Sequence, residues 1–332
     1  MNIQKFSPKS LRDFFGQELI KKRLKILFDK YDKNQTLPAS FFIYGPVGMG
    51  KRTLAKILAN RIKRKIFWLD DISTSYDLIS IMLSGLPDNV FCFYNLENID
   101  TKIQSFLARV LKEKSLEFII GGGKNIKVNL EKLVVVGISQ RASQVSKNLI
   151  ENFYEIFHLE KYKIREIKKI ISSIAKKQKI NIDNEALWEI AHCSRKNPQK
   201  ALALLNKIND FAENYKKENI TFSLVQKALK ELGIDRIGLE KFDRDLLKTI
   251  IEKFSGGPVG IENYAAKLGE SPWNIEEVHE PYLIEIGFLK RSARGRSVSR
   301  EAHEYLGYQY SVGKTIGKLK TNKSLRNQKK LF

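Results

Sequence analysis

One segment constrains the fold of this chain more than any other. The apolar run at residues 41–44 precedes a loop, GPVGMGKRT, at residues 45–53, and a helical pattern follows. This order of strand, glycine-rich loop, lysine and helix nearly matches the phosphate-binding loop G-x-x-x-x-G-K-[ST]. Its glycines let backbone N–H groups surround phosphate oxygens at a helix N-terminus, and Lys51 can reach the β- and γ-phosphates. We therefore predict an α/β domain built around a phosphate site.

Short apolar runs recur through the first half of the chain, and helical stretches separate them. The runs lie at residues 41–44, 66–69, 91–94 and 133–136. Strands buried on both faces of a parallel sheet need such continuous apolar runs. Further along, apolar residues recur at helical spacing without strands. An α/β domain over 1–158 is therefore expected to precede a small helical domain over 159–233.

The last third of the chain has the pattern of a winged helix. The apolar face of one helix ends at GGP, residues 256–258, and Ser271-Pro272 opens a second helix that reaches Ile284. Residues 288–291 and 296–298 can then pair as a hairpin. We predict a winged-helix domain over 234–310, followed by a basic tail over 311–332 that has seven basic residues and no acidic one.

Composition narrows the possible partners and compartments. The 332 residues include 59 Lys and Arg against 37 Asp and Glu, which gives a net charge of +22. Such a charge favours polyanions, above all nucleic acid, although a lysine-rich coding bias explains part of it. Two cysteines in apolar segments, no run of about 20 apolar residues and no signal-peptide pattern predict a cytoplasmic protein without a membrane span.

The catalytic half of the phosphate site is unusual. Arg52 stands at the Mg²⁺-ligand position, and a guanidinium cannot ligate a cation. Thr53 comes one residue late, about 100° further around the helix. An ATPase also needs acids at the end of a later strand, but Tyr94 and Asn95 stand there. We therefore predict no metal ligand, and Asn95 is at best a residue that positions water.

This order of phosphate loop, helical lid and basic C-terminal module is similar to the AAA+ family. The segment SLRDFFGQ at residues 10–17 resembles the start of the RuvB family of bacterial AAA+ motors, and GGPVG, EPYL, IGFL and RGR within 256–307 resemble its C-terminal domain. The resemblance covers about residues 5–308. It implies ATP and Mg²⁺ as cofactors, and a homohexamer that drives branch migration of Holliday junctions on duplex DNA. The implied partners are a RuvA tetramer and RuvC, in recombination and repair.

The resemblance also assigns residues, and many of the expected ones are missing. It implies ATP contacts from Gly45, Gly48, Gly50, Lys51, Arg52, Thr53 and Tyr162. Ser139 keeps the hydroxyl of a sensor position. The start-segment arginine, metal threonine, two acids, arginine finger and lid arginine are replaced by Ser7, Arg52, Tyr94, Asn95, Asn152 (with Ile150) and Gln199.

These replacements leave two main hypotheses. An arginine finger alone is worth roughly 10³–10⁵ in rate, so the pattern predicts weak or absent hydrolysis. The first hypothesis is an ATP-driven DNA translocase with a slow site. The second is a hydrolysis-deficient subunit that binds DNA and RuvA. A third, a clamp-loader-like scaffold, fits the degenerate site but not the Arg-Gly-Arg segment.

Two surfaces are predicted to contact partners. The hairpin near residue 294 brings together Arg291, Arg294 and Arg296, which suit phosphate contacts and are the predicted DNA-binding residues. The alternative is a protein-docking wing with a solvated basic surface. A second hairpin around residues 121–123 carries Ile119, Ile120 and Ile126, which are expected either to contact RuvA or to pack on their own domain.

Overall fold

The computed structural model describes residues 8–34, 40–69, 89–120 and 124–310. The chain forms two compact units, Met1–Val225 and Gln226–Phe332. Ser7 and the tail over 311–332 lie outside the described residues, so the predictions made for them stay predictions. Within the described ranges, no helix is long and apolar enough to cross a membrane.

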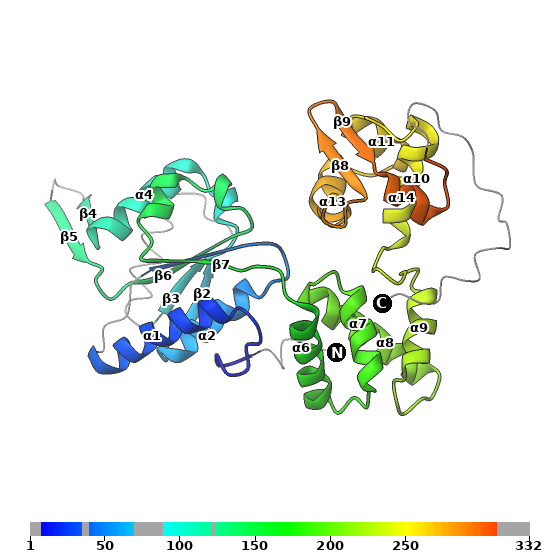
Figure 1. Cartoon of the computed structure of the whole chain (residues 1–332). Coiled ribbons are helices and arrows are strands. Elements are labelled where there is room, and N and C mark those ends of the chain that lie inside the picture. Colours follow the sequence, from blue (N-terminus) through cyan, green and yellow to red (C-terminus); the bar gives the residue numbers. More distant parts are fainter. Residues whose placement is uncertain (1–7, 35–39, 70–88, 121–123, 311–332) are drawn as a thin grey trace. The chain divides into compact units, whose positions relative to one another are not determined.

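A five-stranded parallel sheet forms the centre of the first unit (Figure 1). Its strand order is β2-β3-β6-β1-β7. The strands are β1 (Ser40–Tyr44), β2 (Lys65–Leu69), β3 (Asn89–Phe93), β6 (Val134–Ser139) and β7 (Glu155–His158). The three central strands β3, β6 and β1 are almost wholly buried, as their apolar runs require. The predicted parallel α/β domain is confirmed.

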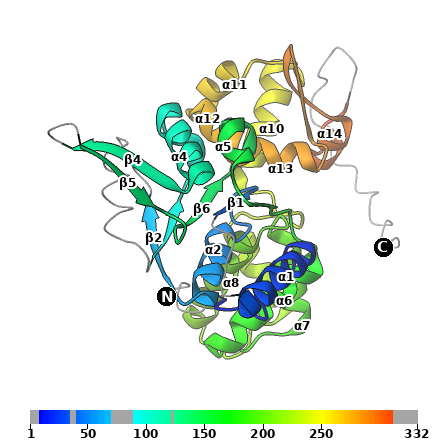
Figure 2. The same cartoon turned by 90° about the vertical axis from the view of Figure 1, so that its left-hand side faces the viewer.

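Helices cover both faces of this sheet, as Figures 1 and 2 show. On one side lie α1 (Glu18–Asn34) and α2 (Lys51–Arg61), and on the other lie α4 (Thr101–Glu113) and the short α5 (Lys147–Glu151). The core on the α4 side joins Phe42 and Phe91 of the sheet to Leu107 of α4. This packing fixes the carboxyl edge of the sheet, where β1 and β3 end in loops.

The predicted hairpin over 115–129 is present. Its strands, β4 (Ser115–Ile120) and β5 (Lys124–Asn129), pair antiparallel with Phe118 opposite Ile126. Glu117 and Lys127 form an ion pair of 2.9 Å across the strands. The turn at 121–123 lies outside the described residues, and the proposed RuvA contact of this hairpin stays a prediction.

A helical bundle follows β7. Its helices are α6 (Ile164–Gln178), α7 (Asn184–Cys193), α8 (Pro198–Asn214) and α9 (Phe222–Glu231). α6 buries Ile167, Ile171 and Ile174 at helical spacing, which is the pattern that predicted it. α8 begins at Pro198, and Asn197 caps it by accepting the N–H groups of Gln199 and Lys200.

The second unit contains the predicted winged helix. It consists of α10 (Lys241–Phe254), α11 (Ile261–Leu268), α12 (Pro272–Asn274), a π-helical turn η4 (Ile275–His279), α13 (Glu280–Glu285), β8 (Leu289–Ser292), β9 (Gly295–Val298) and α14 (Arg300–Leu306). The helix expected from Ser271 to Ile284 is continuous but contains η4. Because Pro281 has no N–H to donate, the turn before it widens to the π form.

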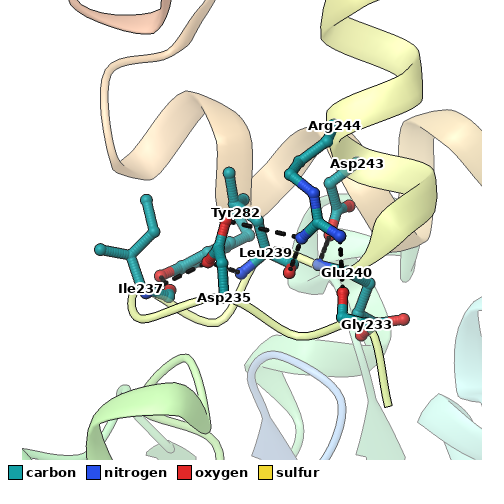
Figure 3. A network of polar contacts seen from close by, with 8 residues as sticks. All are labelled: Gly233, Asp235, Ile237, Leu239, Glu240, Asp243, Arg244 and Tyr282. Carbon is teal, nitrogen blue, oxygen red and sulfur yellow. Dashed lines mark hydrogen bonds and ion pairs between the residues drawn. The ribbon is translucent and has the colours of Figure 1, made fainter. Parts of the chain in front are cut away.

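The segment that leads into α10 is fixed by a polar network, drawn in Figure 3. The guanidinium of Arg244 donates to the carbonyl oxygens of Leu239 and Gly233, each at 2.7 Å. The carboxylate of Asp235 accepts the N–H groups of Ile237 and Leu239 at 3.1 and 2.8 Å. The segment therefore has a defined conformation held by side chains, although it is neither helix nor strand.

Arg244→Ala should loosen this segment. The variant loses two charge-assisted hydrogen bonds, and we expect a cost of about 1–3 kcal/mol in local stability. Hydrogen exchange of the amides of Ile237 and Leu239 measures it, and exchange should become faster. Lys241→Ala, an exposed site on the same helix, is the matched control. Equal exchange in both variants would contradict the assignment.

Candidate nucleotide and nucleic-acid sites

The loop between β1 and α2 is shaped by glycines. Gly45, Gly48 and Gly50 have φ values of 140°, 83° and 96°, in the region that side chains disfavour. A Cβ at Gly45 would lie 2.3 Å from the carbonyl oxygen of Leu159. Gly50 is the N-cap of α2 and has no side chain to accept its first N–H groups. The N-terminus of α2 is thus suited to an anion.

Lys51 lies inside this loop rather than on its surface. Its side chain is buried, and the ammonium donates to the carbonyl oxygens of Gly45 at 2.5 Å and Pro46 at 2.9 Å. Burial lowers the pKa of Lys51 to about 8, and the negative charge of Glu97 opposes that shift. A bound phosphate would replace the two carbonyls as acceptors and favour the protonated lysine.

Two residues from beyond the sheet contact the loop. The buried Tyr162 donates its hydroxyl to the carbonyl of Met49 at 3.2 Å, and burial raises its pKa. Asn197 donates from Nδ2 to the carbonyl of Val47 at 2.9 Å. The resemblance assigned Tyr162, which the structure brings to the loop. Sequence reasoning missed Asn197, although its place before Pro198 marked it as a helix cap.

Arg52 occupies the metal-ligand position and is held by aromatic rings. It is exposed, and its Cζ lies 3.7 Å from the ring centroid of Tyr94 and 5.3 Å from that of Trp68. The rings come from the ends of β3 and β2, and the contacts are of the cation–π type. Two positions that differ from the family pattern, 52 and 94, therefore contact each other.

These residues fit the phosphates of a nucleotide but not a magnesium ion. The glycine loop, the start of α2 and Lys51 supply donors and positive charge. Mg²⁺ requires oxygen ligands in octahedral geometry, and a guanidinium on an aromatic ring offers none. The described residues also include no group of three or more His, Cys, Asp or Glu that could hold a metal.

The expected water-positioning residues are only partly at the site. Asn95 has a left-handed backbone, φ 56°, and its buried Oδ1 has no hydrogen-bond partner among the described residues. The Ser139 hydroxyl hydrogen-bonds at 3.0 Å with the backbone of Arg141, and its carbonyl accepts the Gly45 N–H at 3.3 Å. Ser139 therefore holds the loop through its backbone and a turn through its hydroxyl.

Glu97 is a site residue that sequence reasoning missed. One carboxylate oxygen accepts the N–H of Gln140 at 3.0 Å, and the other is buried without a hydrogen-bond partner in the described ranges. Its charge acts on Lys51. The signal in the sequence is an acid two positions after Asn95. The finger and lid positions carry no cation: Asn152 donates to the carbonyl of Asn148, and Gln199 lies at the start of α8.

The wing of the second unit separates its three arginines. Arg291 is half exposed and pairs with Glu276 at 2.5 Å, and Arg294 is exposed at the tip. Arg296 is only 8% exposed, and its Nε donates to Glu280 at 2.8 Å. Glu280 is 1% exposed, so its charge needs this partner.

This burial corrects one expectation from the sequence. Arg296 was predicted to contact DNA, but the structure uses it inside the domain, where Tyr264 also donates to Glu280. The DNA assignment is therefore restricted to Arg291 and Arg294, and Arg296 holds the wing on α13.

The fold and the loop together define a P-loop protein of the AAA+ class with a lid and a winged helix. Three family models match the chain: the Holliday junction DNA helicase RuvB P-loop domain over residues 6–159, the RuvB AAA lid domain over 162–235 and the RuvB C-terminal winged helix domain over 236–307. The chain belongs to the RuvB family. Its P-loop family implies ATP and Mg²⁺.

Known relatives agree along most of the chain. "Holliday junction branch migration complex subunit RuvB" of Treponema denticola is 36% identical over 305 residues, which are 90% of this chain and 89% of that protein. The same subunit of Fervidobacterium nodosum is 34% identical over 311 residues, which are 92% and 90% of the two chains. The Thermotoga maritima RuvB Holliday junction branch migration motor has a similar structure, with a TM-score of 0.81 and 32% identity over 92% of this chain and 99% of that one.

The burial of Lys51 predicts that phosphate binding depends on pH. Because its pKa is lowered to about 8, the ammonium loses its proton as the pH rises through 8. The affinity for ADP should therefore fall roughly tenfold from pH 7 to pH 9, as the protonated fraction falls. Calorimetric titration measures it. Lys51→Arg keeps its charge throughout and is the control. An equal fall in both proteins would exclude Lys51 as the titrating group.

Proposed function

We propose that this chain is the RuvB subunit of a Holliday-junction branch-migration complex, acting on DNA in recombination and repair. The observation that carries the proposal is similarity to RuvB along the whole architecture, with a TM-score of 0.82 over 93% of the chain. The chain keeps each part that junction work requires, including a phosphate loop, a lid and a basic wing. By analogy with the family, it assembles as a homohexamer in the cytoplasm.

The proposed partners are junction DNA, RuvA and RuvC. The exposed wing arginines, Arg291 and Arg294, suit phosphate contacts, which are indifferent to sequence. Three glutamates, Glu276, Glu277 and Glu280, lie on the preceding helical segment and disfavour its entry into a major groove. The β4–β5 hairpin is the proposed contact for RuvA.

A second candidate function is a subunit that binds nucleotide without turning it over. The specific observation in its favour is the stack of Arg52 on Tyr94, which replaces both a metal ligand and an acid. The family reaction needs a metal ion that bridges the β- and γ-phosphates. The residues that bind phosphate remain, whereas those that activate water do not. We favour this mechanism for the site, within the same complex and on the same DNA.

The wing proposal predicts a loss of DNA affinity. The double variant Arg291→Ala with Arg294→Ala should bind a four-way junction more weakly. Because each phosphate contact contributes about 0.9 to the salt slope, the slope of log affinity against log salt should become shallower by about 2. Fluorescence anisotropy at several salt concentrations measures both quantities.

Two controls make this result specific. Arg300→Ala removes another exposed arginine of the same unit and should leave the slope unchanged. Arg296→Ala should lower the melting temperature, because it leaves Glu280 buried and unpaired. An unchanged slope in the double variant would show that the wing tip does not contact DNA.

The mechanism is tested by steady-state ATP hydrolysis. With Mg²⁺, four-way-junction DNA and the cognate RuvA, we expect turnover no greater than that of Lys51→Ala, while junction binding is retained. Loss of a metal ligand and an acid together removes water activation and charge neutralisation by the ion. Turnover that disappears only in Lys51→Ala would instead establish an ATP-driven translocase with an unorthodox site.

A further inference from the structure

We infer that Arg52 replaces the magnesium ion at the phosphate loop, so that this chain binds nucleoside di- and triphosphates in their metal-free form. This inference rests on the proposed nucleotide binding and adds its ionic requirement. It starts from one contact: the guanidinium of Arg52 lies 3.7 Å from the centroid of the Tyr94 ring.

The two substitutions form one structural unit. In P-loop proteins a Ser or Thr after the lysine and an acid after a later strand hold the ion from two sides. Here the same two positions hold a cation and the ring that supports it. An aspartate at position 94 would form a salt bridge with Arg52 and cancel its charge, whereas a phenol ring attracts the guanidinium through its π face without neutralising it.

The geometry favours phosphate as the ligand. Arg52 is the second residue of α2, directly after Lys51, so both side chains start from the helix end whose N–H groups form the anion site. Tyr94 and Trp68 contact the face of the guanidinium from the ends of β3 and β2. Its N–H donors lie in the plane of the group, at right angles to the stacking direction. A planar, oriented guanidinium is the side chain best suited to bidentate phosphate contacts.

Electrostatics then exclude the usual ion. A divalent cation at this position would lie beside a permanent positive charge, with the ammonium of Lys51 nearby, and repulsion between charges only a few ångströms apart costs several kcal/mol at the dielectric of a protein surface. The metal-free triphosphate carries more negative charge than its magnesium complex. It is therefore the form that two adjacent cations bind better.

The test compares nucleotide binding with and without metal. ADP and a non-hydrolysable ATP analogue are titrated into the full-length chain, once in excess EDTA and once in excess Mg²⁺. We expect binding in EDTA that is as tight as in Mg²⁺ or tighter. Arg52→Ala should weaken binding in EDTA at least tenfold, the effect of losing one charge-assisted contact. Tyr94→Phe keeps the ring and should bind as the unmodified chain does.

The outcomes separate this inference from the proposal beneath it. Binding that requires Mg²⁺ would overturn the role of Arg52 and leave nucleotide binding intact. No binding in either medium would overturn nucleotide binding itself, and this inference with it. Loss in both media in Lys51→Ala confirms that the titration reports on the loop. The comparison of media uses the unmodified chain, so it stays decisive even if Arg52→Ala fails to fold, which circular dichroism would reveal.

Discussion

A buried ammonium holds the phosphate loop in shape. Lys51 donates to two carbonyls of the loop that precedes it, and those carbonyls point inward only because the glycines adopt positive φ. Tyr162 and Asn197 bond two other carbonyls of the same loop, those of Met49 and Val47. The loop is therefore fixed from within by β1 and α2 and from outside by the residues after β7. Each of these contacts depends on the parallel sheet, which sets where β1 ends.

Much of this fold could be predicted because its signals are local. Continuous apolar runs identified the strands of the sheet, and a glycine-rich loop between an apolar run and a helical pattern identified the site. The π turn in the winged helix was missed, because it depends on how the turn before Pro281 adjusts within a helix whose other residues indicated regular geometry. Here a single missing N–H decided the local structure.

The site was predictable in part, and the rest depended on contacts between distant segments. Arg52 and Tyr94 were each recognised as replacements, but their stacking requires that β3 end beside the start of α2, with Trp68 of β2 alongside. Arg296 looked like a surface cation, since nothing local indicates that Glu280 is buried next to it. Charge alone does not distinguish a DNA contact from an internal ion pair; the burial of the partner does.

Binding and hydrolysis make different demands on a cation, and this site separates them. Neutralising phosphate charge requires only a positive group at the right place, which a guanidinium provides. Activating water requires a metal that lowers the pKa of a bound water, or a base directed at it. Asn95 and Ser139 supply no such base, and Glu97 is directed at the Gln140 N–H. Substitutions at 52 and 94 therefore remove the second property and can keep the first, because the glycines and Lys51 that hold the phosphates lie on the opposite side of the loop's chemistry from the residues that changed.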